Sequence, residues 1–199
     1  MDVMLLRHGE TEWSRAGRHT GRTDLPLTAR GEEQARALAR VLTGRSFSLI
    51  LVGPALRARR TAELAGITSY EVEPDLWEWD YGGYEGVTTP EIRESRPGWY
   101  LWRDGVVPGD AGHPGESVEQ VGARADKVVA RLRSAGGDVL VVAHGHILRV
   151  LAARWLGLPP DDGRYFRLDT GTYSVLGHEH EEPVLLRWNA PLDCDAPAG

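Results

Sequence analysis

The stretch Val3-Met4-Leu5-Leu6-Arg7-His8-Gly9-Glu10 is a short apolar run that ends in a polar turn. Such a run is typical of a strand that is buried on both faces of a sheet. Two later runs have the same form: 48–52 is closed by Gly53-Pro54, and 139–143 is closed by His144-Gly145-His146. Because amphipathic helical patterns alternate with these runs, the chain is predicted to form parallel strands joined by helices.

Helix signals between the runs complete this pattern. Thr28 is the predicted N-cap of a helix that Gly44 would end, and Ser117 with Gln120 forms a capping-box pattern. Helices are predicted over 29–43, 55–64, 118–132 and 147–156, and weaker strands over 172–176 and 184–188. The fold class predicted is α/β: a three-layer sandwich with a mostly parallel central sheet and helices on both faces. The segment 14–28 is expected to be a long loop.

The chain has 199 residues, of which 41% are hydrophobic and 26% charged. This length and balance predict a single domain over 1–199. An aromatic-rich insertion over about 77–116 interrupts the helix and strand pattern, and a polar tail covers about 191–199. Most rings of the insertion are expected to pack onto the body, whereas Trp79 and Tyr81 are candidates for a pocket wall.

Charge and hydropathy exclude several classes of protein. No apolar run is long enough to span a membrane, and no basic segment precedes a signal-type apolar run. The net charge of −6 argues against a nucleic-acid or acidic-membrane partner, which would need an excess of basic residues. Cys194 has no second cysteine to pair with, so a reducing cytoplasm is the expected location.

Reactive side chains follow each of the three strong strands. In a parallel sheet the carboxyl ends of the strands form the ligand site, so Arg7-His8, Arg57 and His144 are expected to converge there. Arginines repel metal ions but suit phosphate oxygens, which favours phosphoryl transfer without a metal. One neutral imidazole would attack phosphorus while the arginines and the second imidazole neutralise the oxygens. Glu78 is the candidate proton donor, because flanking tryptophans would desolvate it.

Other side chains remain candidates beside these. Asp80 and Glu85 are rivals of Glu78 for the role of acid. His113 and Glu116 are candidates for the pocket wall, next to a helix N-terminus that would favour an anion.

Several sequence blocks carry a resemblance to a known family. The block 5–13, Leu-Leu-Arg-His-Gly-Glu-Thr-Glu-Trp, resembles the signature of the histidine phosphatase superfamily, in its phosphoglycerate-mutase-like branch. Further blocks match in the expected order over 20–35, 54–62, 78–86 and 143–149, so the resemblance covers nearly the whole chain. The motif details are similar to those of actinobacterial acid phosphatases that are often labelled phosphoglycerate mutases, and partly to sedoheptulose bisphosphatases.

The resemblance implies roles for individual residues. His8 would be the nucleophile that forms a phosphohistidine, and Glu78 would be the proton donor. Arg7, Arg57 and His144 would complete the phosphate pocket. Substrate-binding roles are also predicted for Ser14, Thr20, Gly21, Tyr81, Gly145 and His146. No metal ion or cofactor is expected, and a homodimer is left open because dimers are common in relatives.

The chain departs from the mutases of this family after the acidic residue. Those proteins follow it with Arg-His-Tyr-Gly, whereas this chain has Trp79-Asp80-Tyr81-Gly82 and an insertion without lysine. Because Asp80 should weaken the capture of a carboxylate, the predicted activity is hydrolysis of small phosphorylated metabolites, with sugar phosphates as the favoured class. The alternatives are a phosphoglycerate mutase, a catalytically weak phospho-ligand-binding module, and a metal-dependent hydrolase that uses His144, His146 and Glu10.

Overall fold

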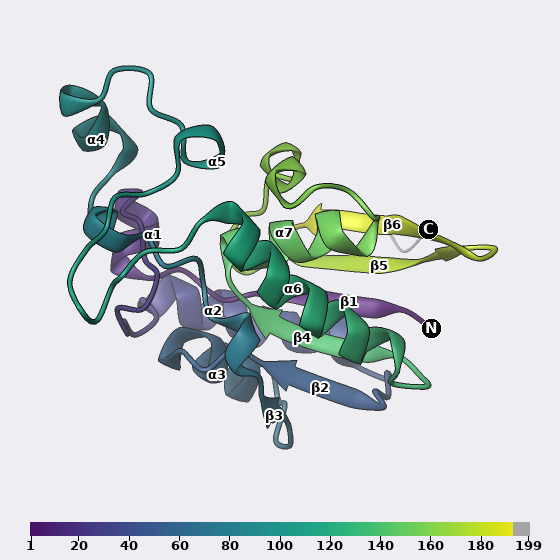
Figure 1. The fold of residues 1–199 in the computed structure, drawn as a ribbon. Coiled ribbons are helices and arrows are strands. Elements are labelled where there is room, and N and C mark those ends of the chain that lie inside the picture. The colour runs from purple at the N-terminus through teal and green to yellow at the C-terminus, as the bar shows by residue number, and fades with distance from the viewer. Residues whose placement is uncertain (193–199) are drawn as a thin grey trace.

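A six-stranded sheet forms the centre of the computed structural model, which describes residues 1–192 (Figure 1). The strand order is β3-β2-β4-β1-β5-β6. The strands are β1 (Val3–Arg7), β2 (Leu49–Val52), β3 (Glu71–Val72), β4 (Val139–Ala143), β5 (Tyr173–Glu179) and β6 (Glu182–Ala190). Strand β4 pairs in parallel with β1 and β2, and β2 pairs in parallel with β3, whereas β5 is antiparallel to both β1 and β6. The predicted mostly parallel sheet is confirmed.

Helices connect the strands and build the insertion. The α-helices are α1 (Glu12–Ala16), α2 (Ala29–Leu42), α3 (Leu56–Leu64), α4 (Thr89–Ser95), α5 (Leu101–Asp104), α6 (Val118–Arg133) and α7 (Gly145–Trp155). Three 3-10 helices are η1 (Pro74–Leu76), η2 (Gly82–Tyr84) and η3 (Pro160–Tyr165). The segment 77–116 holds η2, α4 and α5, and Figure 1 shows α4 and α5 beyond the carboxyl ends of the parallel strands.

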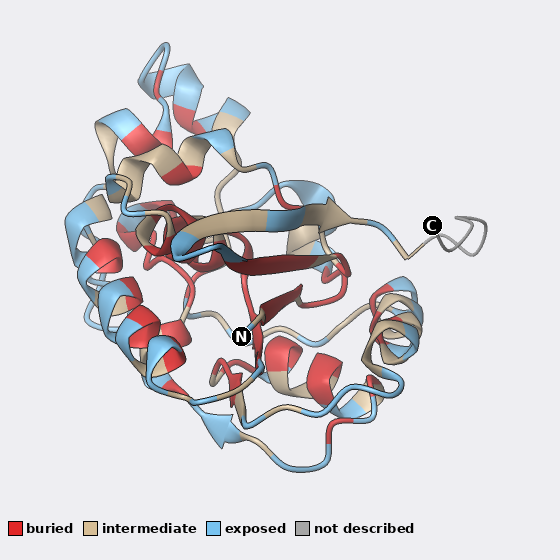
Figure 2. Ribbon diagram, turned by 90° about the vertical axis from the view of Figure 1, so that its right-hand side faces the viewer, coloured by how far each residue is buried: buried red, intermediate tan, exposed pale blue. Residues whose placement is uncertain are grey.

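Successive side chains of the central strands enter two different cores. Val3 and Leu5 of β1 belong to the cluster that includes side chains of α6 and α7. Met4 and Leu6 belong to the cluster that includes side chains of α2 and α3. Figure 2 shows the buried central strands and the exposed outer faces of the helices. Alternation along a strand puts neighbours on opposite faces, so two apolar cores require helices on both sides of the sheet.

Local signals in the sequence set most element boundaries correctly. Thr28 caps α2 by accepting from the backbone of Gly31, and Ser117 with Gln120 forms a capping box at α6. The loop prediction over 14–28 is wrong at its start, since α1 begins with its own capping box between Thr11 and Ser14. Strand β3 was not predicted because it has two residues, both exposed, and therefore no apolar pattern.

The turn after β1 is held by a close backbone contact with the first turn of α2. A Cβ atom on Gly9 would lie 2.1 Å from the carbonyl oxygen of Gly31, so neither position has room for a side chain. The backbone N–H of Gly171 donates to the carbonyl oxygens of both Arg7 and His8. These contacts fix the turn that carries His8 at the carboxyl end of the central strand. Cys194 and the rest of the predicted polar tail after Leu192 lie outside the described residues.

Candidate active site

A cavity of about 190 Å³ lies at the carboxyl end of the parallel strands. It is lined by Arg7, His8, Thr11, Ser14, Gly17, Arg18, His19, Thr20, Glu78, Tyr81 and His146. These residues come from the end of β1 and the turn after it, α1 and the loop after it, the start of the insertion and the first turn of α7. The structure thus brings together seven of the predicted site residues in one wall: Arg7, His8, Ser14, Thr20, Glu78, Tyr81 and His146.

The ring of His8 presents an unprotonated nitrogen. Its Nδ1 lies 2.7 Å from the carbonyl oxygen of Gly9, and a carbonyl oxygen can only accept, so Nδ1 carries the proton. The lone pair of the neutral ring is therefore on Nε2. Burial, together with the charges of Arg57 and Arg7, holds the pKa of His8 well below its usual range. The ring is neutral at pH 7 and has the electronic form that a nucleophile requires.

The ring of His144 has the opposite tautomer. The Nε of Arg57 donates to the Nδ1 of His144 over 3.1 Å, so the ring proton is on Nε2. That Nε2 is buried and has no hydrogen-bond partner among residues 1–192. Burial and the charge of Arg57 lower the pKa of His144 well below its usual range. The centroids of the His8 and His144 rings lie 5.1 Å apart. His144 is fully buried and does not line the cavity itself.

The guanidinium of Arg7 supplies a second free donor. One Nη group donates to the carbonyl oxygen of Leu168, but Nε is buried and has no partner within the described chain. A Cβ atom on Gly145 would lie 3.1 Å from the Cζ atom of Arg7, so the glycine leaves room for this guanidinium. Gly145 does not line the cavity itself.

Arg57 is fully buried and does not line the cavity. Its Nη1 donates to the carbonyl oxygen of Thr23, and its Nη2 donates to those of Thr20 and Gly21, over 2.9–3.2 Å. With the bond to His144, at least four of its five N–H groups are used within the protein. The sequence predicts that Arg57 binds phosphate oxygens directly, whereas here its main contacts orient His144 and the loop 20–23.

Glu78 lies at the N-terminus of α7, 5% exposed. Its Oε1 accepts from the backbone N–H groups of Trp79 and Ile147, and its Oε2 accepts from that of His146, all at 2.9 Å. The sequence predicts only aromatic neighbours for this carboxyl group, whereas in the structure it also accepts hydrogen bonds from three backbone N–H groups. Since Oε2 accepts only one of these bonds, it is the oxygen with a lone pair left for a proton or a water molecule.

Three uncharged rings, those of Tyr81, His146 and His19, also line the cavity. The hydroxyl of Tyr81 lies 2.6 Å from the Nδ1 of His146, and the Nδ1 of His19 lies 2.6 Å from the carbonyl oxygen of Val87. Burial lowers the pKa of both His146 and His19, and burial with the charge of Glu78 raises that of Tyr81. All three rings are uncharged at pH 7.

The two rival acids have other partners. The carboxylate of Asp80 accepts from the Nε of Arg22 at 3.0 Å and from the backbone N–H of Gly82. Glu85 accepts from the backbone N–H groups of Gly21 and Thr23. Neither carboxylate lines the cavity, and each holds a loop in place.

Several other predicted wall residues lie outside the cavity. Glu116 accepts from the backbone of Asp80 and from Arg124, and His113 pairs with Asp110. Trp79 is fully buried, and its indole N–H donates to the carbonyl oxygen of Glu116. The sequence reasoning missed Thr11, Gly17, Arg18 and His19 as wall residues. Part of the signal was available, because Thr11 lies in the block 5–13 and Arg18 and His19 directly precede the block 20–35.

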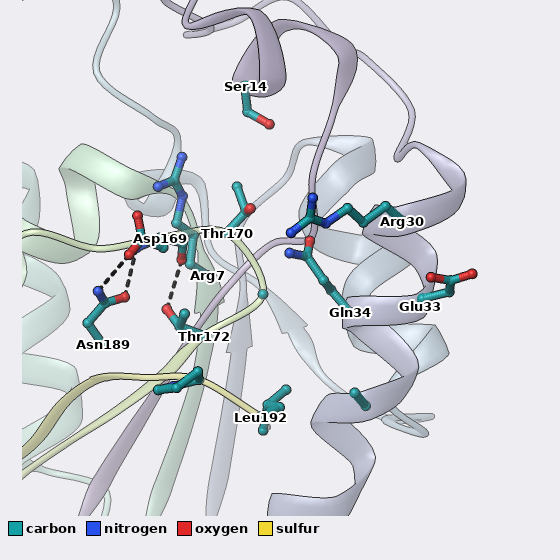
Figure 3. Close-up of a pocket in the computed structure, with 13 residues that line it drawn as sticks. Arg7, Ser14, Arg30, Glu33, Gln34, Asp169, Thr170, Thr172, Asn189 and Leu192 are labelled. Carbon is teal, nitrogen blue, oxygen red and sulfur yellow. Dashed lines mark hydrogen bonds between the residues drawn. The ribbon is translucent and has the colours of Figure 1, made fainter. Parts of the chain in front are cut away.

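A larger cavity of about 730 Å³ lies on the other side of Arg7 and Ser14 (Figure 3). It is bounded by α2, the loop 169–172 and the end of β6. In Figure 3 the side chains of Arg30 and Gln34 point into this cavity, whereas the carboxylate of Glu33 points away. His8 and Glu78 do not line it, so it lacks the groups on which the chemistry of the smaller cavity depends.

Residues 1–192 offer no set of metal ligands for the metal-dependent alternative. No three His, Cys, Asp or Glu side chains come together there as a metal ion would require. The carboxylate of Glu10 accepts from the hydroxyl of Thr28, and Glu10 does not line the cavity. Within the same residues, no helix has both the length and the apolar character needed to cross a bilayer.

Comparison with known proteins gives consistent results. The model of the histidine phosphatase superfamily (branch 1) matches residues 3–191. An acid phosphatase of Mycobacterium tuberculosis is 44% identical, over 89% of this chain and 87% of its own length. The sedoheptulose 1,7-bisphosphatase of Saccharomyces cerevisiae is 37% identical, over 78% of this chain and 67% of its own length. The solved structure of a Mycobacterium tuberculosis open reading frame has a TM-score of 0.89 and 41% identity, and the match covers 96% and 98% of the two chains.

Proposed function

Because this chain belongs to the histidine phosphatase superfamily, branch 1, and is a phosphatase, we propose that it hydrolyses small phosphate monoesters through a phosphohistidine on His8. The observation that carries this proposal is a pair of buried N–H groups, Nε of Arg7 and Nε2 of His144, that have no acceptor within residues 1–192. Arg7 lines the same cavity as His8, and the ring centroid of His144 lies 5.1 Å from that of His8. Leaving a buried donor unpaired costs about 1–3 kcal/mol. A phosphate anion would accept from both donors while its phosphorus faces Nε2 of His8.

The reaction then follows in two steps. Nε2 of His8 attacks phosphorus, the bond between phosphorus and the ester oxygen breaks, and the leaving oxygen takes the proton of Glu78 in its carboxylic acid form, which leaves Glu78 as a carboxylate. In the second step the Glu78 carboxylate takes a proton from a water molecule, whose oxygen attacks the phosphohistidine. The bond from phosphorus to Nε2 breaks and inorganic phosphate is released. Arg7 and His144 donate to the phosphoryl oxygens throughout, so the step needs no metal ion.

The wall around Glu78 supports an uncharged, hydroxyl-bearing leaving group such as a sugar. His19, Tyr81 and His146 offer polar atoms and ring faces but no charge. Nε2 of His19 is free to accept from a hydroxyl, because Nδ1 carries the proton that is donated to Val87.

A phosphoglycerate mutase would need cations to hold a carboxylate during the return transfer. The insertion arginines are used elsewhere: Arg93 donates to Trp99, Arg96 to Tyr84 and Arg103 to Asp104. Arg18 is the one cation besides Arg7 in the cavity wall drawn from residues 1–192, and it is exposed. We therefore favour hydrolysis over mutase activity.

The test is trapping of the phosphoenzyme. Wild-type protein is mixed with a sugar phosphate in the presence of a chelator, quenched, and analysed for acid-labile phosphohistidine, with free phosphate and isomerised product measured separately. Label and turnover are expected in the wild type and in His113→Ala, whose ring lies outside the cavity. Both should be absent in His8→Ala. A label that persists in His8→Ala, or that requires added metal, contradicts the proposal.

A further inference from the structure

We propose that Glu85 is a positioning residue which, through the loop 20–23 and Arg57, keeps His144 in the tautomer that donates to the phosphoryl group. The proposal rests on the function proposed above and adds a residue that does not touch the cavity. It is carried by an unbroken series of hydrogen bonds from Glu85 to His144, with each partner named below.

The series begins where Glu85 holds the loop. Both carboxylate oxygens lie 3.0 Å from the backbone N of Gly21, and Oε1 also accepts from that of Thr23 at 3.1 Å. The loop fits tightly against this carboxylate, since a Cβ atom on Gly21 would lie 2.8 Å from Oε2 of Glu85 and 2.6 Å from the carbonyl oxygen of Trp79. The glycine is thus required by the contact.

One peptide group joins the charges of Glu85 and Arg57. The N–H of Gly21 and the carbonyl of Thr20 belong to the same peptide plane, whose N–H donates to Glu85 while its oxygen accepts from Nη2 of Arg57. Hydrogen bonds at the two ends of a peptide polarise each other and become stronger. The carboxylate therefore acts on the buried guanidinium through this peptide, and it compensates part of the cost of burying a cation.

Arg57 then determines the protonation of His144. Its side chain is fully buried, and the loop carbonyls of Thr20, Gly21 and Thr23 fix the guanidinium so that Nε meets Nδ1 of His144. An arginine N–H can only donate, so Nδ1 must accept and the ring proton stays on Nε2. If the loop moved, Arg57 could turn, and the ring could place its proton on Nδ1. The site would then lose a donor to the phosphoryl group.

A glutamine at position 85 tests the charge and the hydrogen-bond pattern together. Its shape is nearly that of glutamate, but its NH₂ group would face backbone N–H groups that are donors themselves. We expect Glu85→Gln to lower kcat/KM by about 10- to 100-fold, mainly through kcat, because part of the molecules would lack the Nε2–H donor of His144 to the transition state. Inhibition by vanadate should weaken in parallel. Glu85→Asp, which keeps the charge, should lose less.

The decisive measurement is the ¹⁵N spectrum of the histidine rings, with His144 assigned from a His144→Gln variant. Wild-type His144 should show a protonated Nε2, and Glu85→Gln should show a mixture of tautomers. The control is Glu94→Gln, an exposed carboxylate of α4, which should change neither the spectrum nor kcat/KM by more than roughly twofold.

Each outcome decides the proposal. An unchanged His144 spectrum in Glu85→Gln overturns it, even if activity falls, because the effect would then not pass through His144. If Glu85→Gln does not fold, Glu85→Asp takes its place, because its shorter side chain moves the carboxylate away from the loop: a changed His144 spectrum with a lowered kcat/KM supports the proposal, and an unchanged spectrum overturns it. Absence of a phosphoenzyme in the wild type would refute the proposed function instead. The ¹⁵N spectrum would still test whether Glu85 controls the tautomer of His144.

Discussion

Replacing Glu78 by glutamine separates its role in protonating the leaving group from its role in the structure. An alcohol must receive a proton as it departs, whereas p-nitrophenolate departs readily without one. Glu78→Gln should therefore lower the hydrolysis of a sugar phosphate by about 10²- to 10⁴-fold, and that of p-nitrophenyl phosphate much less. The amide can neither give up a proton in the first step nor accept one from water in the second.

The structural cost of this change can be worked out from the contacts. The glutamine oxygen can keep the two bonds that Oε1 accepts from Trp79 and Ile147. Its NH₂ group would then face the N–H of His146, so one hydrogen bond to a charged acceptor is lost. Such a bond contributes about 1.5–3 kcal/mol to stability. For a chain of this size we expect the melting temperature to fall by about 3–12 °C, which leaves the variant folded in an assay at 25 °C.

The assay compares kcat/KM for the two substrates in wild type, Glu78→Gln and Asp80→Asn. Asp80 is the matched control, because it is a buried carboxylate two residues away that pairs with Arg22 and does not line the cavity. Asp80→Asn should lower stability without changing the ratio between the substrates. Equal losses on both substrates in Glu78→Gln would refute Glu78 as the general acid, and selectivity in Asp80→Asn would transfer the role to Asp80.

Three further predictions concern the surroundings of the site. Arg57→Lys should lower kcat/KM by about 10- to 100-fold and weaken vanadate inhibition, because one ammonium cannot reproduce the planar set of bonds. The control is Arg60→Lys, at a half-buried arginine of the same helix that pairs with Glu32 outside the cavity, and it should change neither quantity. Normal vanadate inhibition in Arg57→Lys would contradict the assignment. The free energy of unfolding should fall as the pH drops below about 6.5, because the histidines of the unfolded chain then take up protons that the buried histidines of the folded chain do not. An equal urea midpoint at pH 7 and pH 5 would contradict neutral rings at His8, His144 and His146. Arg30→Ala should leave kcat/KM for monophosphates within roughly twofold, and a tenfold loss would mean that the substrate extends past Arg7 into the larger cavity.

The fold was predictable because its signals are local. Four or five consecutive apolar residues specify each central strand, and side chains such as Thr28 and Ser117 specify helix starts within three residues. The prediction of elements failed where an element is too short to show an apolar pattern. Helix α1 has five residues and none of them is buried, so no apolar face marked it. Its start was nevertheless encoded in the capping box of Thr11 and Ser14.

The groups at the strand ends were predictable for a topological reason. His8 and His144 follow β1 and β4, and neighbouring parallel strands bring their carboxyl ends together. The bonds that these groups make were not predictable from sequence. Arg57 reaches Gly21 and His144 across 36 and 87 residues, and Glu85 reaches Gly21 across 64. No periodicity or composition links such positions, so the use of Arg57 to orient a histidine emerges only from the folded chain.

The opposite tautomers of the two central histidines explain how similar rings can have different roles. A carbonyl oxygen next to Nδ1 of His8 forces its lone pair to Nε2, whereas an arginine next to Nδ1 of His144 forces its proton to Nε2. Both rings are kept neutral by burial and by nearby guanidinium groups. The assignment of nucleophile and donor thus depends on what each Nδ1 contacts. Exchanging the roles would require a carbonyl in place of Arg57, and this is why we expect substitutions around Arg57 to impair His144 without supplying a second nucleophile.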